Sequence, residues 1–187
     1  MDALLPTFLA ALLAEWGDKT QLLAALLAAR FPNRRAILGG IAIAALANSL
    51  IAAAGGRIVA DLINFRAIGL MVALALIAAG AGGLFRQKAP TLAEQGRFGA
   101  FVTSAFAMFV LEFGDKTQFL TLTLAARADS LLLAASGATA GILAAAVPAI
   151  MLGRRFADLP VRAVRLGASL LLLLVGMIGM AGALRLL

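Results

Sequence analysis

The chain has 187 residues, of which 63% are hydrophobic and only 13% are charged, and its mean hydropathy is +1.03. A soluble domain has about half apolar and about a quarter charged residues, so this composition excludes a soluble globular protein. The formal net charge is +7, and most of the basic residues lie between apolar runs. Basic residues at these places are typical of cytoplasmic loops and of contacts with anionic lipid headgroups, so the positive charge does not indicate binding to nucleic acid.

Six apolar runs predict transmembrane helices, because about 20 residues span a hydrocarbon core of about 30 Å. In chain order they cover residues 3–29, 36–56, 67–85, 98–126, 131–153 and 164–184. The first run has no basic segment before it and does not read as a cleavable signal peptide. We therefore expect an all-α integral membrane protein with one transmembrane domain over residues 1–187.

The chain repeats itself at an offset of 97 residues. EWGDKTQLLAALLAAR at 15–30 and EFGDKTQFLTLTLAAR at 112–127 match at eleven of sixteen positions, and GRIVADL aligns with GRRFADL at the same offset. We place one repeat at 1–85, a connecting loop at 86–97 and the second repeat at 98–187. Because three spans per repeat is an odd number, the second repeat enters the membrane from the other side. This predicts two inverted three-helix repeats, as in many secondary transporters.

The basic residues predict the orientation. Ten of them flank the first, third and fifth connections, and four lie on the other side. Since cytoplasmic loops carry the excess of lysine and arginine, both termini are expected outside the cytoplasm. In a bacterium the membrane would be the plasma (inner) membrane. The chain's partners would then include the lipid bilayer, and a homo-oligomer is compatible with the sequence.

Ionisable residues near the middle of the first and fourth spans need an explanation. They are Glu15, Asp18, Lys19, Glu112, Asp115 and Lys116. On a continuous helix, residues three and four apart share a face, so each triplet would gather on one face. Insertion of six such residues costs on the order of 15 to 20 kcal/mol unless they pair or bind something.

Two interpretations of these charges remain open. In the structural one, Lys19 and Lys116 each neutralise the glutamate of their own helix, and the aspartates hydrogen-bond between helices. In the other, four carboxylates against two lysines leave a charge of −2, which a divalent cation neutralises. Oxygen ligands suit Ca²⁺, Mg²⁺ or Mn²⁺, and the absence of cysteine and histidine argues against zinc and copper. Protons would replace the metal when it leaves, since crowded carboxylates cannot all stay ionised.

Neighbouring polar side chains supply further oxygens. The candidates are Thr20, Gln21, Thr117, Gln118 and, more weakly, Asn48. On an ideal helix, Thr20 points away from Glu15. A helix break at Gly17 or Gly114 would change this, whereas the same glycines would otherwise permit close helix packing.

At these residues the chain resembles the GDT-type cation/proton antiporters, a family with Golgi manganese and calcium transporters and bacterial manganese exporters. Its signature is two copies of E-φ-G-D-[KR]-[ST], one in each three-helix half, and EWGDKT and EFGDKT both fit. The resemblance covers essentially the whole chain. It implies that Glu15, Asp18, Glu112 and Asp115 form the cation and proton site, with Mn²⁺ or Ca²⁺ as the substrate.

Other functional classes fit less well. An intramembrane aspartyl protease needs a G-x-G-D motif, which EFGDK lacks, and no enzyme explains two nearly identical half-sites. The chain is therefore not expected to be an enzyme or to hold a cofactor. A passive cation channel and a structural membrane protein with intramembrane ion pairs remain as alternatives, and proton-dependent exchange would separate a carrier from both.

Overall fold

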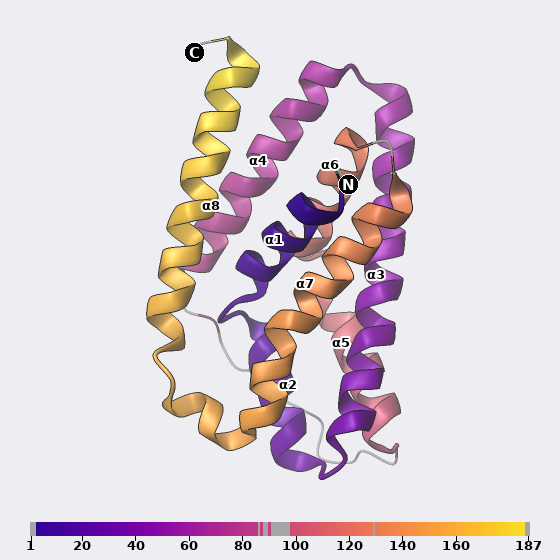
Figure 1. Cartoon of the computed structure of the whole chain (residues 1–187), viewed down its shortest axis with the longest axis vertical. Coiled ribbons are helices and arrows are strands. Elements are labelled where there is room, and N and C mark those ends of the chain that lie inside the picture. Colours follow the sequence, from indigo (N-terminus) through magenta and orange to yellow (C-terminus); the bar gives the residue numbers. More distant parts are fainter. Residues whose placement is uncertain (1–2, 86, 88–89, 91–97, 129, 186–187) are drawn as a thin grey trace.

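The computed structural model describes residues 3–85, 87, 90, 98–128 and 130–185. Within these residues every regular element is a helix. In chain order they are α1 (Leu4–Glu15), α2 (Lys19–Arg30), α3 (Arg34–Leu62), α4 (Phe65–Leu84), α5 (Ala100–Glu112), α6 (Lys116–Arg127), α7 (Leu131–Leu152), the 3₁₀ helix η1 (Gly153–Asp158) and α8 (Val161–Leu184). The helices form one elongated bundle (Figure 1).

Four helical segments are long and apolar enough to cross a membrane, which makes this a multi-pass membrane protein. They are Arg34–Leu62, Phe65–Leu84, Leu131–Phe156 and Val161–Leu184. Two further apolar helices, Leu4–Glu15 and Ala100–Glu112, are shorter. The all-helical class is confirmed, whereas the arrangement of six spans in two inverted repeats stays a prediction.

The two runs predicted as helices at 3–29 and 98–126 are each divided in two. α1 ends at Glu15 and α2 begins at Lys19, and α5 and α6 are separated in the same way. The backbone turns at Gly17 and Gly114, whose φ angles are +74° and +75°. Residues with a Cβ rarely adopt such angles, so glycine at these two places permits the break.

Other helix boundaries also differ from the sequence-based ones. α3 continues to Leu62 instead of ending at residue 56, because GRIVADL contains no proline and keeps a helical pattern. Asn64 then caps α4 by accepting a hydrogen bond from the backbone N–H of Ala67. The predicted connecting loop at 86–97 lies outside the described residues except at Gln87 and Pro90.

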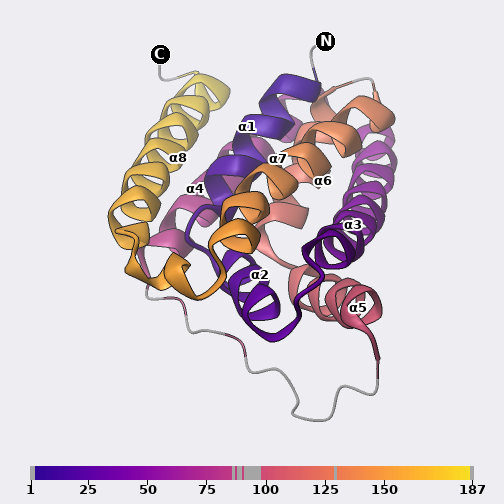
Figure 2. The same ribbon diagram turned by 60° about the horizontal axis from the view of Figure 1, so that its bottom comes forward.

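Equivalent helices of the two repeats run in opposite directions. In Figure 1, α3 runs toward the top and α7 toward the bottom, while α4 runs down and α8 runs up. Helices of one repeat pack on helices of the other in equivalent pairs: α1 of the first repeat packs on α7 of the second, and α5 of the second packs on α3 of the first. A Cβ on Gly40 would collide with the carbonyl of Phe101, and one on Gly137 would collide with that of Leu4, which is the same contact with the repeats exchanged. The start of α1 and the end of α8 lie at one end of the bundle (Figure 2).

The interior around the two helix breaks is built from small and branched apolar side chains. One cluster joins Leu23 and Leu27 of α2 to Ile41 of α3 and Ile142 of α7. A second cluster joins α1, α4, α6 and α8 around Leu120 and Leu172. Many of the other members are alanines, so the helix axes approach closely and polar groups at the breaks are enclosed.

Candidate cation-binding site

Each helix break leaves an aspartate at the start of the following helix. The backbone N–H of Asp18 bonds to the carbonyl of Glu15 at 3.1 Å, and that of Asp115 bonds to the carbonyl of Glu112 at 3.0 Å. Both aspartates are the N-caps of their helices, but neither side chain makes a capping hydrogen bond. Their carboxylates therefore remain available to other partners, next to helix N-termini that favour negative charge.

A glutamine braces each break. The side-chain oxygen of Gln21 accepts a hydrogen bond from the backbone N–H of Gly17 at 2.7 Å, and its amide donates to the carbonyl of Ala145 at 2.6 Å. In the second repeat, Gln118 accepts from Gly114 at 2.7 Å and donates to the carbonyl of Asn48 at 3.4 Å. The two predicted supporting glutamines thus tie each break to a long helix of the other repeat.

Three of the four predicted carboxylates come together. Glu15, Asp18 and Asp115 each offer an oxygen within 4.8 Å of the others. Glu15 and Asp18 are buried, and Asp115 is partly buried. The first and second repeats both contribute to this group, which we call the three-carboxylate site. A group of hard oxygen ligands at this spacing suits a cation such as Mn²⁺ or Ca²⁺.

Two threonines hold Glu15 in this arrangement. The hydroxyl of Thr117 donates to Glu15 Oε1 at 2.5 Å, and the hydroxyl of Thr20 donates to Glu15 Oε2. An ideal helix would have pointed Thr20 away from Glu15, so the hydrogen bond within the first repeat depends on the break at Gly17. Both predicted supporting threonines therefore serve the same glutamate.

The lysines pair between the repeats and not within them. Lys116 Nζ lies 2.8 Å from Asp18 Oδ1, and Lys19 Nζ lies 3.4 Å from Asp115 Oδ1. The structural interpretation, in which each lysine neutralises the glutamate of its own helix, is wrong on this point. It assumed a continuous helix, and the break turns each lysine toward the opposite aspartate.

Each aspartate keeps one oxygen without a partner. Asp18 Oδ2 and Asp115 Oδ2 are buried and accept no hydrogen bond, while their Oδ1 atoms face the lysines. A buried carboxylate oxygen without a partner is costly. The three-carboxylate site thus has unused ligand capacity that a cation can satisfy.

Glu112 is not one of the three grouped carboxylates, although its sequence position is equivalent to that of Glu15. Its Oε2 accepts a hydrogen bond from Asn48 Nδ2 at 3.3 Å, and its Oε1 has no partner. No threonine hydroxyl donates to Glu112 among the described hydrogen bonds. The structure therefore groups three of the four predicted ligands within 4.8 Å and leaves the fourth outside that group.

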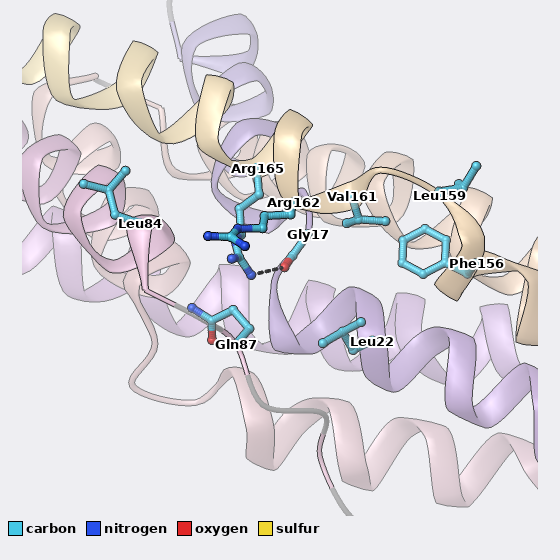
Figure 3. Close-up of a pocket in the computed structure, with 9 residues that line it drawn as sticks. All are labelled: Gly17, Leu22, Leu84, Gln87, Phe156, Leu159, Val161, Arg162 and Arg165. Atoms are coloured by element: carbon cyan, nitrogen blue, oxygen red, sulfur yellow. Dashed lines mark hydrogen bonds between the residues drawn. The ribbon is translucent and has the colours of Figure 1, made fainter.

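A cavity of about 710 Å³ lies beside the first break (Figure 3). Its lining includes Gly17, Leu84, Phe156, Arg162 and Arg165, with no carboxylate, so it does not suit a cation. Arg165 Nη1 donates to the carbonyl of Gly17 at 3.4 Å, a contact drawn as a dashed line in Figure 3. In the sequence, Arg165 is one of the ten basic residues that flank the first, third and fifth connections, and nothing in its spacing links it to the motif.

Comparisons with known proteins give one consistent result. Residues 3–91 and 100–185 match a family model described as "Divalent cation/proton antiporter GDT1". A protein of Vibrio cholerae serotype O1 named "Putative manganese exporter" is 38% identical over 147 residues, which are 78% of this chain and 74% of that protein. No solved structure matches the chain.

Proposed function

The chain belongs to the GDT1 family of divalent cation/proton antiporters, and from this premise we propose that it exports Mn²⁺ from the cytoplasm in exchange for protons. The family consists of transporters and not enzymes. Calcium is the second candidate substrate, since the same oxygen ligands accept it. The name of the Vibrio cholerae relative favours manganese.

The three-carboxylate site is the observation that carries this proposal. Its three negative charges exceed the two positive charges of Lys19 and Lys116, and Glu112 adds one more nearby. A divalent cation balances the resulting charge of −2. The unpartnered oxygens of Asp18 and Asp115 are the atoms that we expect to bind it first.

The crossed lysines give the exchange a physical basis. When the cation binds, Asp18 and Asp115 turn from an ammonium group to the metal, and each lysine is released. When the cation leaves, protons and the two lysines together neutralise the negative charge of the carboxylates, because an unpaired charge in a low-dielectric interior is costly. Metal and protons thus compete for the same oxygens, which is sufficient for antiport when the site opens alternately to the two sides.

The direction of transport follows from energetics and from the predicted orientation. Each positive charge moved outward against the membrane potential costs about 2.3 kcal/mol per 100 mV, so export needs protons moving inward. We propose that the protein lies in the plasma (inner) membrane with both termini outside. The repeats at 1–85 and 98–187 would exchange roles in alternating access, and their oppositely directed helices support this (Figure 1).

The test is metal-driven proton flux in proteoliposomes that contain a pH-sensitive dye. Wild-type protein should move protons in response to Mn²⁺, and Asp18→Asn, which removes one charge of the site, should lose most of this flux. Asp158→Asn is the matched control, because this carboxylate is exposed on η1 far from the motif in sequence. Circular dichroism of each variant checks that it is folded.

Acidification should weaken the apparent Mn²⁺ affinity, because protons compete for the carboxylate oxygens. Parallel measurements with Ca²⁺ and Mg²⁺ determine selectivity. A manganese flux that does not change with the pH gradient would indicate a channel. Undiminished exchange by Asp18→Asn would refute the role of the three-carboxylate site.

A further inference from the structure

The cavity of about 710 Å³ beside the first break has no role in the proposed exchange, because none of its described lining residues is a carboxylate. Leu84 of α4, Phe156 of η1 and Leu159 give it apolar walls. Arg162 and Arg165 of α8 give it two positive charges. We call it the arginine cavity. Its combination of apolar walls and paired positive charges is the chemistry of an amphipathic anion.

The two arginines of the cavity lack negatively charged partners. In the part of the chain that the structure describes, no carboxylate forms an ion pair with either of them. Arg165 Nη1 donates to the carbonyl of Gly17 at 3.4 Å, but its Nε is buried and has no hydrogen-bond partner. Figure 3 shows both arginine side chains pointing from the start of α8 toward the end of α4. A buried donor without a partner is costly, so the cavity has donor capacity that an anion can satisfy.

The start of α8 adds to the positive potential of the cavity. This helix has 24 residues, its N-cap residue Pro160 makes no side-chain capping bond, and its first turn contains no acidic residue. The N-terminus of a helix carries about half a positive charge, so a negative group is favourable there and an arginine is not. Arg162 nevertheless lies in this first turn. A bound anion would offset both sources of positive charge.

The ends of two membrane spans give the depth of the arginine cavity. α4 and α8 are both long and apolar enough to cross a membrane, and they pack against each other. α4 ends at Leu84 and α8 begins at Val161, and both of these residues line the cavity. By the count of basic residues, this end of the two spans faces the cytoplasm. The cavity therefore lies at the level of lipid headgroups, in the leaflet whose surface potential is negative.

We propose that the arginine cavity binds one anionic phospholipid of the cytoplasmic leaflet. The guanidinium groups of Arg162 and Arg165 bind its phosphate, and the walls at Leu84, Phe156 and Leu159 contact its apolar part. A soluble phosphate ion carries the same negative charge but would leave those walls uncovered. The proposal goes beyond the exchange of a divalent cation for protons, which assigns no lipid site.

The first repeat does not carry an equivalent pair of arginines. At the offset of 97, the counterparts of Arg162 and Arg165 are Phe65 and Ile68. These two residues lie at the start of α4, which is the end opposite to Leu84 and is predicted to face away from the cytoplasm. The chain thus places the arginine pair only on the side where anionic headgroups attract basic residues.

Arg165 connects the arginine cavity with the first helix break. Its guanidinium group donates to the carbonyl of Gly17, and a Cβ built on Gly17 would lie 2.8 Å from Cβ of Arg165. A lipid that holds this arginine in place should therefore stabilise the folded chain around the break. Thermal stability thus reports on the site without any measurement of transport.

The experiment is native mass spectrometry of the purified full chain in detergent. The chain is titrated with phosphatidylglycerol, which is anionic, and with phosphatidylcholine of the same acyl chains, whose choline neutralises the phosphate. The variants are Arg162→Gln and Arg165→Gln. Arg155→Gln is the matched control, because it removes the same charge from an exposed residue of η1 that does not line the cavity. Inorganic phosphate, added as a competitor, distinguishes a lipid site from a site for a soluble anion.

Wild-type protein and Arg155→Gln should bind the first phosphatidylglycerol at least about tenfold more tightly than phosphatidylcholine. Arg162→Gln and Arg165→Gln should bind both lipids with similar affinity. Phosphatidylglycerol should also raise the thermal midpoint of the wild type and of Arg155→Gln, but not that of the two cavity variants. Arg162 is exposed, so Arg162→Gln carries the test even if Arg165→Gln fails to fold. No manganese or pH gradient is used, so the result would hold even if proton-coupled export failed.

Three results would overturn the proposal. The first is equal affinity of the wild-type chain for the two lipids. The second is an Arg162→Gln variant that keeps the preference for phosphatidylglycerol, or an Arg155→Gln variant that loses it as completely, which would indicate attraction by surface charge alone. The third is displacement of bound phosphatidylglycerol by inorganic phosphate at equal concentration, which would make the cavity a site for a soluble anion.

Discussion

Lys116 of the second repeat lies 2.8 Å from Asp18 of the first, whereas the equivalent pair, Lys19 and Asp115, lies 3.4 Å apart. The exposed fractions differ in the same sense, at 13% and 2% for the first pair against 30% and 16% for the second. Identical motifs therefore make unequal ion pairs. The closer pair is also the less exposed one, so its loss should lower the free energy of unfolding more.

Replacing each lysine by methionine tests this difference. Lys116→Met leaves the buried Asp18 without its partner and should lower the free energy of unfolding by about 3 to 5 kcal/mol. Lys19→Met removes the more exposed pair and should cost about 1 kcal/mol. Thermal unfolding in detergent, followed by circular dichroism, measures both. Mn²⁺ should raise the midpoint of Lys116→Met more than that of the wild type, because the metal replaces the lost positive charge.

The two glycines of the motif should differ in their tolerance of alanine. Both variants force a side chain into a left-handed conformation, which costs about 1 to 2 kcal/mol. A Cβ on Gly17 would also lie 2.8 Å from Cβ of Arg165, while one on Gly114 has nothing within 4 Å. Gly17→Ala should therefore lose about 1 to 3 kcal/mol more than Gly114→Ala. Equal unfolding midpoints would show that α8 does not pack against the first break.

Thr117→Val should weaken metal binding, because it removes the hydrogen bond that the second repeat donates to Glu15. Loss of such a supporting partner typically costs about tenfold in metal affinity. Thr123→Val is the control, since Thr123 is equally buried and its hydroxyl donates only to the carbonyl of Leu120 in its own helix. Initial rates of Mn²⁺ uptake into inverted vesicles give the KM of each variant. A Thr117→Val KM equal to that of the control would contradict the role of this hydroxyl.

The absence of cysteine makes the orientation directly measurable. Single cysteines at residues 34, 88 and 155 should react with a membrane-impermeant maleimide only after cells are opened. Cysteines at residues 57 and 127, on the opposite side by the positive-inside rule, should react in intact cells. Labelling of residue 88 in intact cells would show that the predicted orientation is wrong, and the predicted direction of export with it.

The all-helical class and the two repeats can be predicted from the sequence, because the length of the apolar runs and the internal repetition are both easy to recognise. The duplicated motif is sufficient to identify Glu15, Asp18 and Asp115 as candidate ligands, and its glycines mark where the helices divide. Whether they divide could not be decided, since glycine also serves close packing in membrane helices.

The inequality of Glu15 and Glu112 was not predictable from matching motifs. It depends on Asn48 facing one glutamate and Ala145 occupying the equivalent position, together with the direction in which two threonine hydroxyls donate. The crossed lysine pairs were missed for a related reason. The i,i+4 rule applies to a continuous helix, and here the break lies between the two residues concerned.

The braces made by Gln21 and Gln118 place no requirement on the side chains at the positions that accept their hydrogen bonds. Each glutamine binds only main-chain atoms of its partners, an N–H at the glycine and a carbonyl at residue 145 or residue 48. Every amino acid offers that carbonyl, so substitution there leaves the brace intact. Positions 48 and 145 can thus carry asparagine in one repeat and alanine in the other while both breaks keep the same support.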